Sequence, residues 1–377
     1  MDSKQKNNLL FISTEFPPGP GGIGNHAWNL ARNLNKKISV DVLTVSNYSS
    51  KEECLAFDRS EKIKIIRFKK YYFSLLTYMH RMYTIVNKVK TDKYSFCIVS
   101  GYFSLLIVLL IRLINKEIII TSVLHGSELI QKNYIINYIL SRSLKKINIL
   151  ISVSKYTNKL IPIKLVKGQK NVIIPNGVNH EMLISQSEIK RENEIIGTPC
   201  LLTVGSITNR KGQINLIKAL PEIIQKYPNI HYHCVGLPIE KQNLVQLVDS
   251  LGLKNYVTLH GVVKNKDLGT FYKSADILIM LSQSNIDFCA EGFGIAILEA
   301  NLFGTPALGS MNTGIEDAIV QYETGVLVNP YSSSDILVGI DKLLEENKQY
   351  SNNAKRWAIK HSWDNITKKY LEILMNA

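Results

Sequence analysis

The chain has 377 residues, a formal net charge of +14, 45% hydrophobic residues and 20% charged residues. This length exceeds what one ordinary core accommodates, so we expect two domains, and the composition excludes a disordered or fibrous protein. The basic charge comes without zinc-finger spacing or an RNP motif, which argues against nucleic acid as a partner.

The positive charge belongs to the first half of the chain. Residues 1–180 hold 27 basic and 10 acidic side chains, whereas residues 181–377 hold 18 and 21. Within the basic half, residues 67–81, RFKKYYFSLLTYMHR, mix cations with aromatic, leucine and methionine side chains. That composition suits either an anionic bilayer surface or an amphipathic helix that is packed in the domain with a solvated basic face. We favour the bilayer and expect peripheral association with the inner face of the cell membrane.

The chain carries no sign of export or of a membrane span. Its first residues, MDSKQKNN, are polar, so we expect no signal peptide. Five cysteines without paired or metal-like spacing fit a reducing cytoplasm. The most apolar run, residues 96–111, is too short and interrupted for a span, and we interpret it as a buried strand over 96–100 followed by a core helix.

Strand-like segments recur through the first half and alternate with helix-length stretches. This alternation predicts a parallel sheet with covering helices. The expected strands are 8–13, 40–45, 63–68, 96–99, 118–123 and 149–154, with a strand and turn at 172–178.

A connection rich in proline and glycine, EFPPGPGGIGNH, follows the first strand. Gly19, Gly21 and Gly24 match the spacing of a dinucleotide-binding turn, but three prolines lengthen and stiffen the connection, so we reject that interpretation. A flexible loop at Gly22 that enters a helix still suits an anion. The alternative is a plain surface turn.

His125 comes just after the strand 118–123, in the sequence VLHGSE. Open α/β sheets bind ligands at the carboxyl ends of their strands, which makes His125 a candidate site residue. A lone histidine is more often structural, so a functional role for His125 depends on the motif around it.

The second half repeats the alternation. Residues 179–199 lack periodicity and are the expected linker. Arg210 and Lys211 follow a strand at 200–204 and precede a helix at 214–220. The planar guanidinium of an arginine beside the compact charge of a lysine suits a diphosphate. The alternative is a solvated basic turn. Further strands are expected at 230–235, 257–260 and 275–281.

Residues 285–305, NIDFCAEGFGIAILEANLFGT, change from loop to helix. We predict a helix over 295–303 that begins after Gly294 and ends at Gly304. The first turn of a helix attracts a phosphate or carboxylate. Glu291 and Glu299 lie at different depths and could accept hydrogen bonds from the hydroxyls of a sugar. The alternative is a glycine-rich turn with a glutamate that favours the helix dipole and a solvated Glu299.

The two glutamates, in E-G-F-G-I-A-I-L-E-A followed by N-L-F-G-T-P, resemble the signature of the family 4 retaining glycosyltransferases. The P-P-x-x-G-G-I-G loop, the H-G-x-E at His125, the I-P-N-G-V segment and Lys211 before Gly212 resemble further motifs of that family, in order along nearly the whole chain. The sequence departs from its pattern in three places. Asn179 replaces an acid, and the loop from Leu281-Ser282 to Glu291 is longer than the usual P-S-x-x-E-x-x-G. Ser206 stands where an arginine is usual, so we expect Arg210 to supply the missing charge.

The resemblance implies an α/β protein of the GT-B fold, with two Rossmann-like doubly wound parallel-sheet domains that face a central cleft. We expect an acceptor-binding domain over 1–180 and a nucleotide-sugar-binding domain over 181–355. Residues 356–377 are expected to form a helix that crosses back to the first domain.

The resemblance also implies the reaction: a retaining, metal-independent hexosyl transfer from a nucleotide-diphosphate sugar to a glycan or lipid-linked acceptor, in bacterial surface polysaccharide synthesis. Glu291 and His125 are then the catalytic residues near the donor sugar, and Glu299 binds the ribose. No cofactor and no metal are expected, and no Asp-x-Asp motif is present. The expected donor-binding residues are Gly22, Arg210, Lys211, Phe293, Gly294 and Glu299.

Two other functions remain open. A nucleotide-sugar 2-epimerase shares the fold and the donor type, and it would epimerise the donor without an acceptor. A non-catalytic partner subunit would dock on the membrane, and its system would stay active after Glu291→Ala. The sequence leaves the nucleotide, the sugar and the acceptor undetermined.

Overall fold

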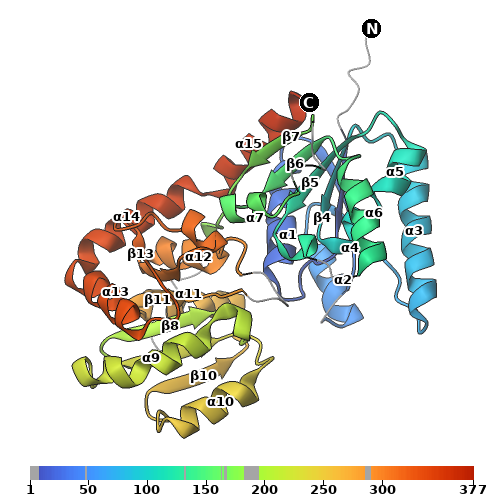
Figure 1. The fold of residues 1–377 in the computed structure, drawn as a ribbon. Coiled ribbons are helices and arrows are strands. Elements are labelled where there is room, and N and C mark those ends of the chain that lie inside the picture. Colours follow the sequence, from blue (N-terminus) through green and yellow to red (C-terminus); the bar gives the residue numbers. More distant parts are fainter. Residues whose placement is uncertain are drawn as a thin grey trace. The chain divides into compact units, whose positions relative to one another are not determined.

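The computed structural model describes residues 8–46, 49–130, 133–162, 164, 168–181, 195–284 and 290–377. Contacts divide the chain into two compact units (Figure 1). The first consists of Met1–Ile174 and Trp363–Ala377, and the second of Pro175–Ser362. Much of the expected linker, residues 182–194, and the start of the loop before Glu291, residues 285–289, lie outside the described residues.

The first unit is a seven-stranded sheet in the order β3-β2-β1-β4-β5-β6-β7, and its paired strands are parallel. The order reverses direction at β1, as in doubly wound sheets. The strands are β1 Asn8–Ser13, β2 Ser39–Thr44, β3 Lys64–Arg67, β4 Phe96–Ser100, β5 Ile119–Leu124, β6 Ile149–Ser152 and β7 Lys170–Ile173. The expected alternation of strands and helices in this half is therefore confirmed.

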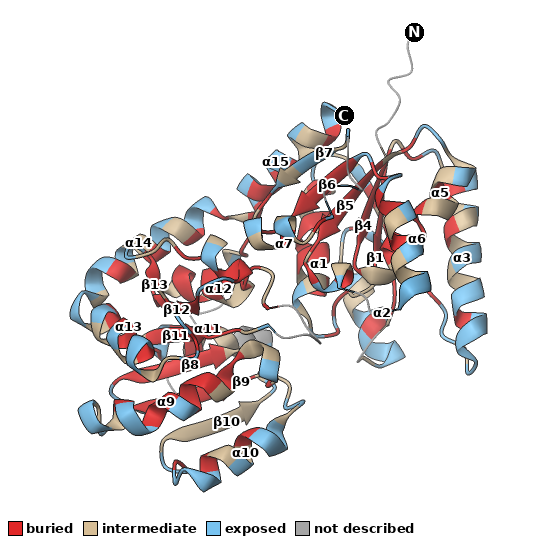
Figure 2. Ribbon diagram, in the orientation of Figure 1, coloured by how far each residue is buried: buried red, intermediate tan, exposed pale blue. Residues whose placement is uncertain are grey.

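Helices cover both faces of this sheet, and its inner strands β1, β4, β5 and β6 are buried and mostly apolar. Figure 2 shows buried strands and helices whose outer faces are exposed. The helices are α1 Gly22–Leu34, α2 Lys51–Ser60, α3 Ser74–Thr91, α4 Tyr102–Leu106, α5 Val108–Ile114, α6 Tyr134–Leu144 and α7 Lys155–Lys159, with a 3-10 turn η1 Ser127–Leu129. The apolar run 96–111 is β4, α4 and the start of α5, and no helix in the described parts is long and apolar enough to cross a membrane.

The second unit is a six-stranded parallel sheet in the order β10-β9-β8-β11-β12-β13. Its strands are β8 Cys200–Val204, β9 His231–Val235, β10 Val257–Gly261, β11 Ile277–Met280, β12 Ala307–Ser310 and β13 Gly325–Val328. Its helices are α9 Gln213–Lys226, α10 Lys241–Ser250, α11 Asn265–Ser274, α12 Ile295–Phe303, α13 Ser333–Glu345 and α14 Asn347–Lys360, with 3-10 turns η3 Asn209–Lys211 and η4 Gly314–Asp317.

The last helix, α15 Trp363–Met375, belongs to the first unit, where it packs on α1. Its apolar stripe at Ile366, Tyr370 and Leu374 is buried. The expected crossing segment began at residue 356, but residues up to Lys360 complete α14, and the chain changes unit at Trp363.

Candidate active site

In the second unit, β8 and β11 are neighbours, so the loops that follow them meet at one edge of the sheet. The loop after β8 forms η3, and Ser282 Oγ, just beyond β11, donates to the carbonyl of Arg210 at 2.8 Å. Gly212 then turns the chain into α9 with a φ of +76°. A Cβ at this position would overlap the carbonyl oxygen of Leu281, so only glycine permits the approach.

Arg210 and Lys211 both contact the carboxylate of Glu291. Arg210 Nη1 lies 2.6 Å and Lys211 Nζ 2.8 Å from Glu291 Oε2. The backbone N–H of Glu291 donates to Ser282 Oγ at 2.8 Å, which fixes the residue to the end of β11. The side chain of Glu291 is 16% exposed and that of Lys211 is 14% exposed, so solvent screens the pair weakly.

The protonation of Glu291 follows from this contact. Burial raises the pKa of its carboxyl, but the charges and hydrogen bonds of Lys211 and Arg210 outweigh burial and lower the pKa to about 2. Glu291 is therefore ionised at neutral pH. The sequence motifs predicted separate contacts of the two cations and of Glu291 with a donor; in the structure the three side chains form one ionic cluster.

The loop changes to helix at Gly294, as expected. Gly294 has a φ of +88°, α12 spans Ile295–Phe303, and Gly304 ends it in the left-handed conformation. Gly294 makes no side-chain cap hydrogen bond to the first turn of α12, whose positive end attracts negative charge. The ring of Phe293 is 1% exposed, so in this structure its side chain packs in the interior.

Glu299 lies further along α12 and has a partner that the sequence did not indicate. Tyr272 on α11 is fully buried, and its hydroxyl donates to Glu299 Oε2 at 2.6 Å. Burial raises the pKa of Glu299, while the Tyr272 hydrogen bond and the charge of Lys211 act in the opposite direction. The position of Tyr272 in the sequence, 27 residues before Glu299 and beside another aromatic residue, carries no signal of this contact.

In the first unit, His125 lies immediately beyond β5, as predicted. Its Nε2 lies 3.1 Å from Ser100 Oγ at the end of β4, and its backbone N–H donates to Glu128 Oε1 at 2.6 Å. Glu128 is 2% exposed, and burial raises its pKa. In the H-G-x-E segment the glutamate thus fixes the backbone of the histidine.

His26 on α1 is a candidate that sequence analysis missed. It is fully buried, and its ring centroid lies 5.0 Å from that of His125 in an edge-on arrangement. Its Nε2 lies 3.5 Å from the hydroxyl of Tyr370 on α15. Burial, followed by the charge of His125, lowers the pKa of His26 well below its ordinary value. His26 lies one turn into the helix that follows the glycine-rich loop, and this position is a sequence signal that could have identified it as a candidate.

Gly22 is the first residue of α1 and is exposed. A Cβ there would meet no atom within 4 Å, so nothing described in its surroundings requires glycine. The space beside it is open to a ligand. Gly22 and His125 thus lie in the first unit, and the remaining candidates, Arg210, Lys211, Glu291, Phe293, Gly294 and Glu299, lie in the second.

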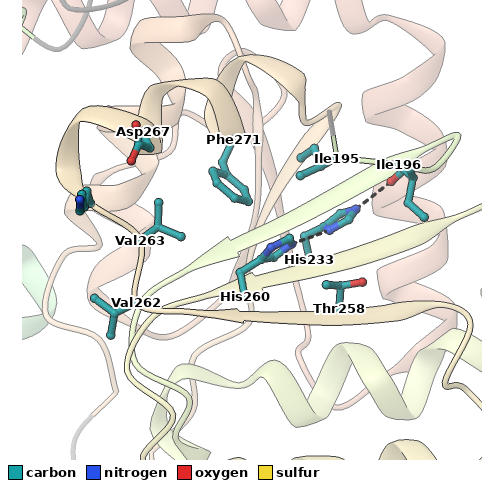
Figure 3. Close-up of a pocket in the computed structure, with 10 residues that line it drawn as sticks. Ile195, Ile196, His233, Thr258, His260, Val262, Val263, Asp267 and Phe271 are labelled. Carbon is teal, nitrogen blue, oxygen red and sulfur yellow. Dashed lines mark hydrogen bonds between the residues drawn. The ribbon is translucent and has the colours of Figure 1, made fainter. Parts of the chain in front are cut away.

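A pocket of about 620 Å³ opens on one face of β9 and β10, beside α11 (Figure 3). His233 Nε2 lies 2.8 Å from the carbonyl of Ile196, and His233 Nδ1 lies 2.9 Å from His260 Nε2. Because a carbonyl only accepts, His233 donates there and, when neutral, accepts from His260. No group of three or more His, Cys, Asp or Glu side chains in the described ranges is arranged to hold a metal ion.

Two family models match consecutive parts of the chain. The model described as Glycosyltransferase Family 4 matches residues 20–182, and the model described as Glycosyl transferases group 1 matches residues 185–359. The chain therefore belongs to the family 4 glycosyltransferases. The family that the motifs predicted is confirmed.

Curated relatives match over part of their length. An uncharacterised glycosyltransferase of Methanocaldococcus jannaschii is 31% identical over 53% of each chain. A D-inositol 3-phosphate glycosyltransferase of Corynebacterium urealyticum is 26% identical over 45% of this chain and 41% of its own. A GDP-mannose-dependent α-(1-6)-phosphatidylinositol monomannoside mannosyltransferase of Mycobacterium tuberculosis is 23% identical over 59% and 60%. The chain spans about half the length of the curated relatives it matches.

Solved structures resemble the whole fold. The HepE protein of Anabaena, solved in complex with UDP and glucose, has a TM-score of 0.79 at 17% identity and covers 98% of this chain and 100% of its own. Sucrose-phosphate synthase of Thermosynechococcus elongatus has a TM-score of 0.79 at 18% identity and 98% coverage of both chains. At these identities the likeness is one of fold, and the predicted GT-B class with two parallel-sheet α/β domains is confirmed.

Proposed function

We propose that the chain transfers a hexosyl group from a nucleotide-diphosphate sugar to a glycan or lipid-linked acceptor, with retention of configuration and without a metal ion. The observation that carries this proposal is the cluster of Arg210, Lys211 and Glu291 beside the first turn of α12. Two cations there hold a single anion. A diphosphate that replaced the carboxylate would meet the same two cations and the positive helix end.

The proposed mechanism rests on charge stabilisation. As the bond to the sugar breaks, negative charge grows on the leaving diphosphate, and preorganised donors that face such charge account for much of catalysis in general. Arg210 and Lys211 would supply that stabilisation in place of a metal. Glu291, once released from them, would accept hydrogen bonds from the sugar, and Glu299 would accept from the ribose. The leaving phosphate itself would help to deprotonate the acceptor.

The choice of donor in this proposal is supported by the comparisons. HepE was solved with UDP, and the mycobacterial relative is GDP-mannose-dependent, which supports a nucleotide sugar as donor. For the nucleotide base we propose the end of β10 at Gly261, where the pocket reaches Val262 and Val263. We also propose that His125 and Gly22 act near the sugar and the acceptor, and that the enzyme works in bacterial surface polysaccharide synthesis at the cytoplasmic face of the membrane.

A thermal-shift screen with UDP, GDP and ADP tests the proposal, because a ligand that binds only the folded state raises its melting temperature. We expect one nucleotide to stabilise the wild type but not Lys211→Ala. Lys226→Ala is the matched control, since Lys226 pairs with Asp341 on another part of the second unit, at 2.7 Å. This control should respond as the wild type does.

The sugar form of the stabilising nucleotide is then supplied with candidate acceptors, and the anomeric configuration of the product is read by NMR. Retention is the expected result. The absence of any nucleotide response, or an equal response in Lys211→Ala, would contradict the proposed site. If an epimerised nucleotide sugar forms without an acceptor, the protein is an epimerase and the proposed transfer is wrong.

A further inference from the structure

Helix α3 buries apolar side chains toward its C-terminal end and exposes apolar side chains along its first half. Ile85 and Val89 are buried, as is the polar Thr77. Leu75 and Met79, in the first half, are 69% and 57% exposed and form an exposed apolar stripe. Packing within the domain therefore accounts for the buried side chains of α3 and not for the exposed stripe.

The exposed stripe continues along α3 at helical spacing. Leu75, Met79 and Met82 are separated by four and three residues and therefore share one face. Leu76 and Tyr83 flank them and are 47% and 68% exposed. Figure 2 shows the outward side of α3 as exposed. These five large side chains form a continuous apolar strip facing solvent.

Neighbouring elements also carry exposed aromatic and apolar side chains. Tyr72 and Phe73, in the turn before α3, are 97% and 64% exposed. Helix α3 contacts α5, and α5 contacts α6, whose Tyr134 and Ile135 are 85% and 68% exposed. We call the exposed side chains of residues 72–83 and 134–138 the α3–α6 surface. An exposed apolar area of this kind marks an interaction site.

The charge of this surface has one sign. The sequence contains no acidic residue between Glu61 and Asp92, and none between Glu128 and Glu181. Lys69 and Lys70 precede the strip and are exposed. The guanidinium of Arg142 on α6 donates to the hydroxyl of Tyr138 at 2.8 Å and lies 5.3 Å from its ring centroid. Helices α3, α5 and α6 thus offer cations and apolar groups without a carboxylate side chain.

We propose that the α3–α6 surface docks the first unit on an anionic lipid bilayer, with its leucine, methionine and aromatic side chains at the acyl boundary and its cations among the headgroups. A second copy of the chain fits less well, because a two-fold interface would oppose the same cationic face to itself. Tyrosine suits the bilayer interface, since its ring is apolar and its hydroxyl remains solvated. This deepens the proposed function by naming the surface that would bring the enzyme to a lipid-linked acceptor.

Vesicle flotation of the full chain tests this surface. Vesicles of phosphatidylcholine alone are compared with vesicles that also contain phosphatidylglycerol, at low and high salt. The test variant is Leu75→Gln with Met79→Gln and Met82→Gln. The matched control is Val338→Gln with Ile359→Gln, because Val338 and Ile359 are comparably exposed, at 62% and 56%, on helices of the second unit.

We expect the wild type and the control to float with the phosphatidylglycerol vesicles, more weakly at high salt. The triple variant should lose more than about tenfold in vesicle affinity, and Lys69→Gln with Lys70→Gln should lose the preference for anionic lipid. Because the substituted side chains are exposed, nucleotide-induced thermal shifts report that folding is intact and test the proposed function separately.

Equal flotation of the triple variant and the wild type would overturn the proposal. So would a wild type that binds neither vesicle. If the wild type fails to float but self-associates in analytical ultracentrifugation, and the triple variant does not, the surface joins copies of the chain and the lipid proposal is wrong.

Discussion

Glu291 forms ion pairs with two cations of the second unit. Its carboxylate lies 2.6 Å from Arg210 and 2.8 Å from Lys211, the two cations proposed for the diphosphate. Donor binding would exchange an internal anion for the diphosphate. In the proposed function, the displaced carboxylate would then bind the sugar hydroxyls, so that donor binding would also expose Glu291.

Glu291→Gln separates these two roles. We expect turnover to fall about 10- to 100-fold, the scale for loss of a hydrogen bond to a charged group. The affinity for the nucleoside diphosphate should stay the same or rise, because no internal carboxylate competes for Arg210 and Lys211. Calorimetry and initial rates measure both, with the exposed Glu323→Gln as control. A parallel loss of nucleotide affinity would show that Glu291 does not compete for the cations.

At the scale of elements, the site depends on how closely η3 approaches the end of β11. Gly212 makes this approach possible, because it combines a φ of +76° with a position against the Leu281 carbonyl. The side chain of Asn215 on α9 donates to the same carbonyl at 3.1 Å. The backbone geometry of this turn thus contributes to the position of Lys211.

Gly212→Ala should therefore cost more than about 2 kcal/mol of unfolding free energy and weaken nucleotide binding. Gly252→Ala is the matched control, since Gly252 has a φ of +69° but a Cβ there meets nothing within 4 Å. Its cost should be about 1 to 2 kcal/mol, from conformation alone, with nucleotide binding unchanged. Urea unfolding and calorimetry measure the two effects. Equal behaviour of the two variants would disprove the importance of the contact with β11.

The histidines of β9 and β10 form a second feature at this scale. The ring centroids of His231 and His233 lie 4.6 Å apart, and those of His233 and His260 lie 5.2 Å apart. Burial is the largest cause that lowers the pKa of all three, and the charge of His233 also lowers those of His231 and His260; together these effects lower the pKa of His231 to about 4. The folded protein thus resists protonation at these positions.

Because the folded protein resists protonation at these histidines, its stability depends on pH. The unfolded chain binds protons at these histidines below a pH of about 6.5, whereas the folded chain does so only at lower pH. Their contribution to stability is therefore complete above about pH 6.5 and is lost as the pH falls toward about 4. His231→Asn should remove about 2 kcal/mol of that dependence, measured by urea unfolding across this range. If His231→Asn leaves the change of unfolding free energy with pH as it is in the wild type, this pH dependence does not come from His231.

At the scale of the whole molecule, the chain ends in the unit where it began. Helix α15 returns to pack on α1, and Tyr370 is fully buried against it, with its hydroxyl 3.5 Å from His26 Nε2. Trp363 also lies against His26, at 5.2 Å between ring centroids. The last helix is thus part of the environment of His26 and, through it, of His125.

Tyr370→Ala should destabilise the first unit by about 3 to 5 kcal/mol, as large-to-small changes in a core do. Hydrogen exchange should speed up in α1 and the strands of the first unit, while the strands of the second unit keep their protection. Lys369→Ala, exposed on the same helix, serves as control and should change neither. Equal loss of protection in both units would contradict the division into two units.

The sequence determined the local elements and the chemistry that each carries. Buried parallel strands are apolar runs, and glycine at positions that need a positive φ marks where a helix begins and ends, so α12 was predicted with the bounds that the structure has. The same local signals identified His125, Arg210, Lys211 and Glu291 as candidates.

The tertiary structure alone decided which of these residues meet. Arg210 and Glu291 are 81 positions apart, and they pair because β8 lies beside β11, although β9 and β10 separate these two strands in the sequence. Tyr272 with Glu299 and His26 with His125 are contacts of the same kind. Strand order depends on how whole helices and sheets pack, which is a property of the complete chain that no short segment encodes.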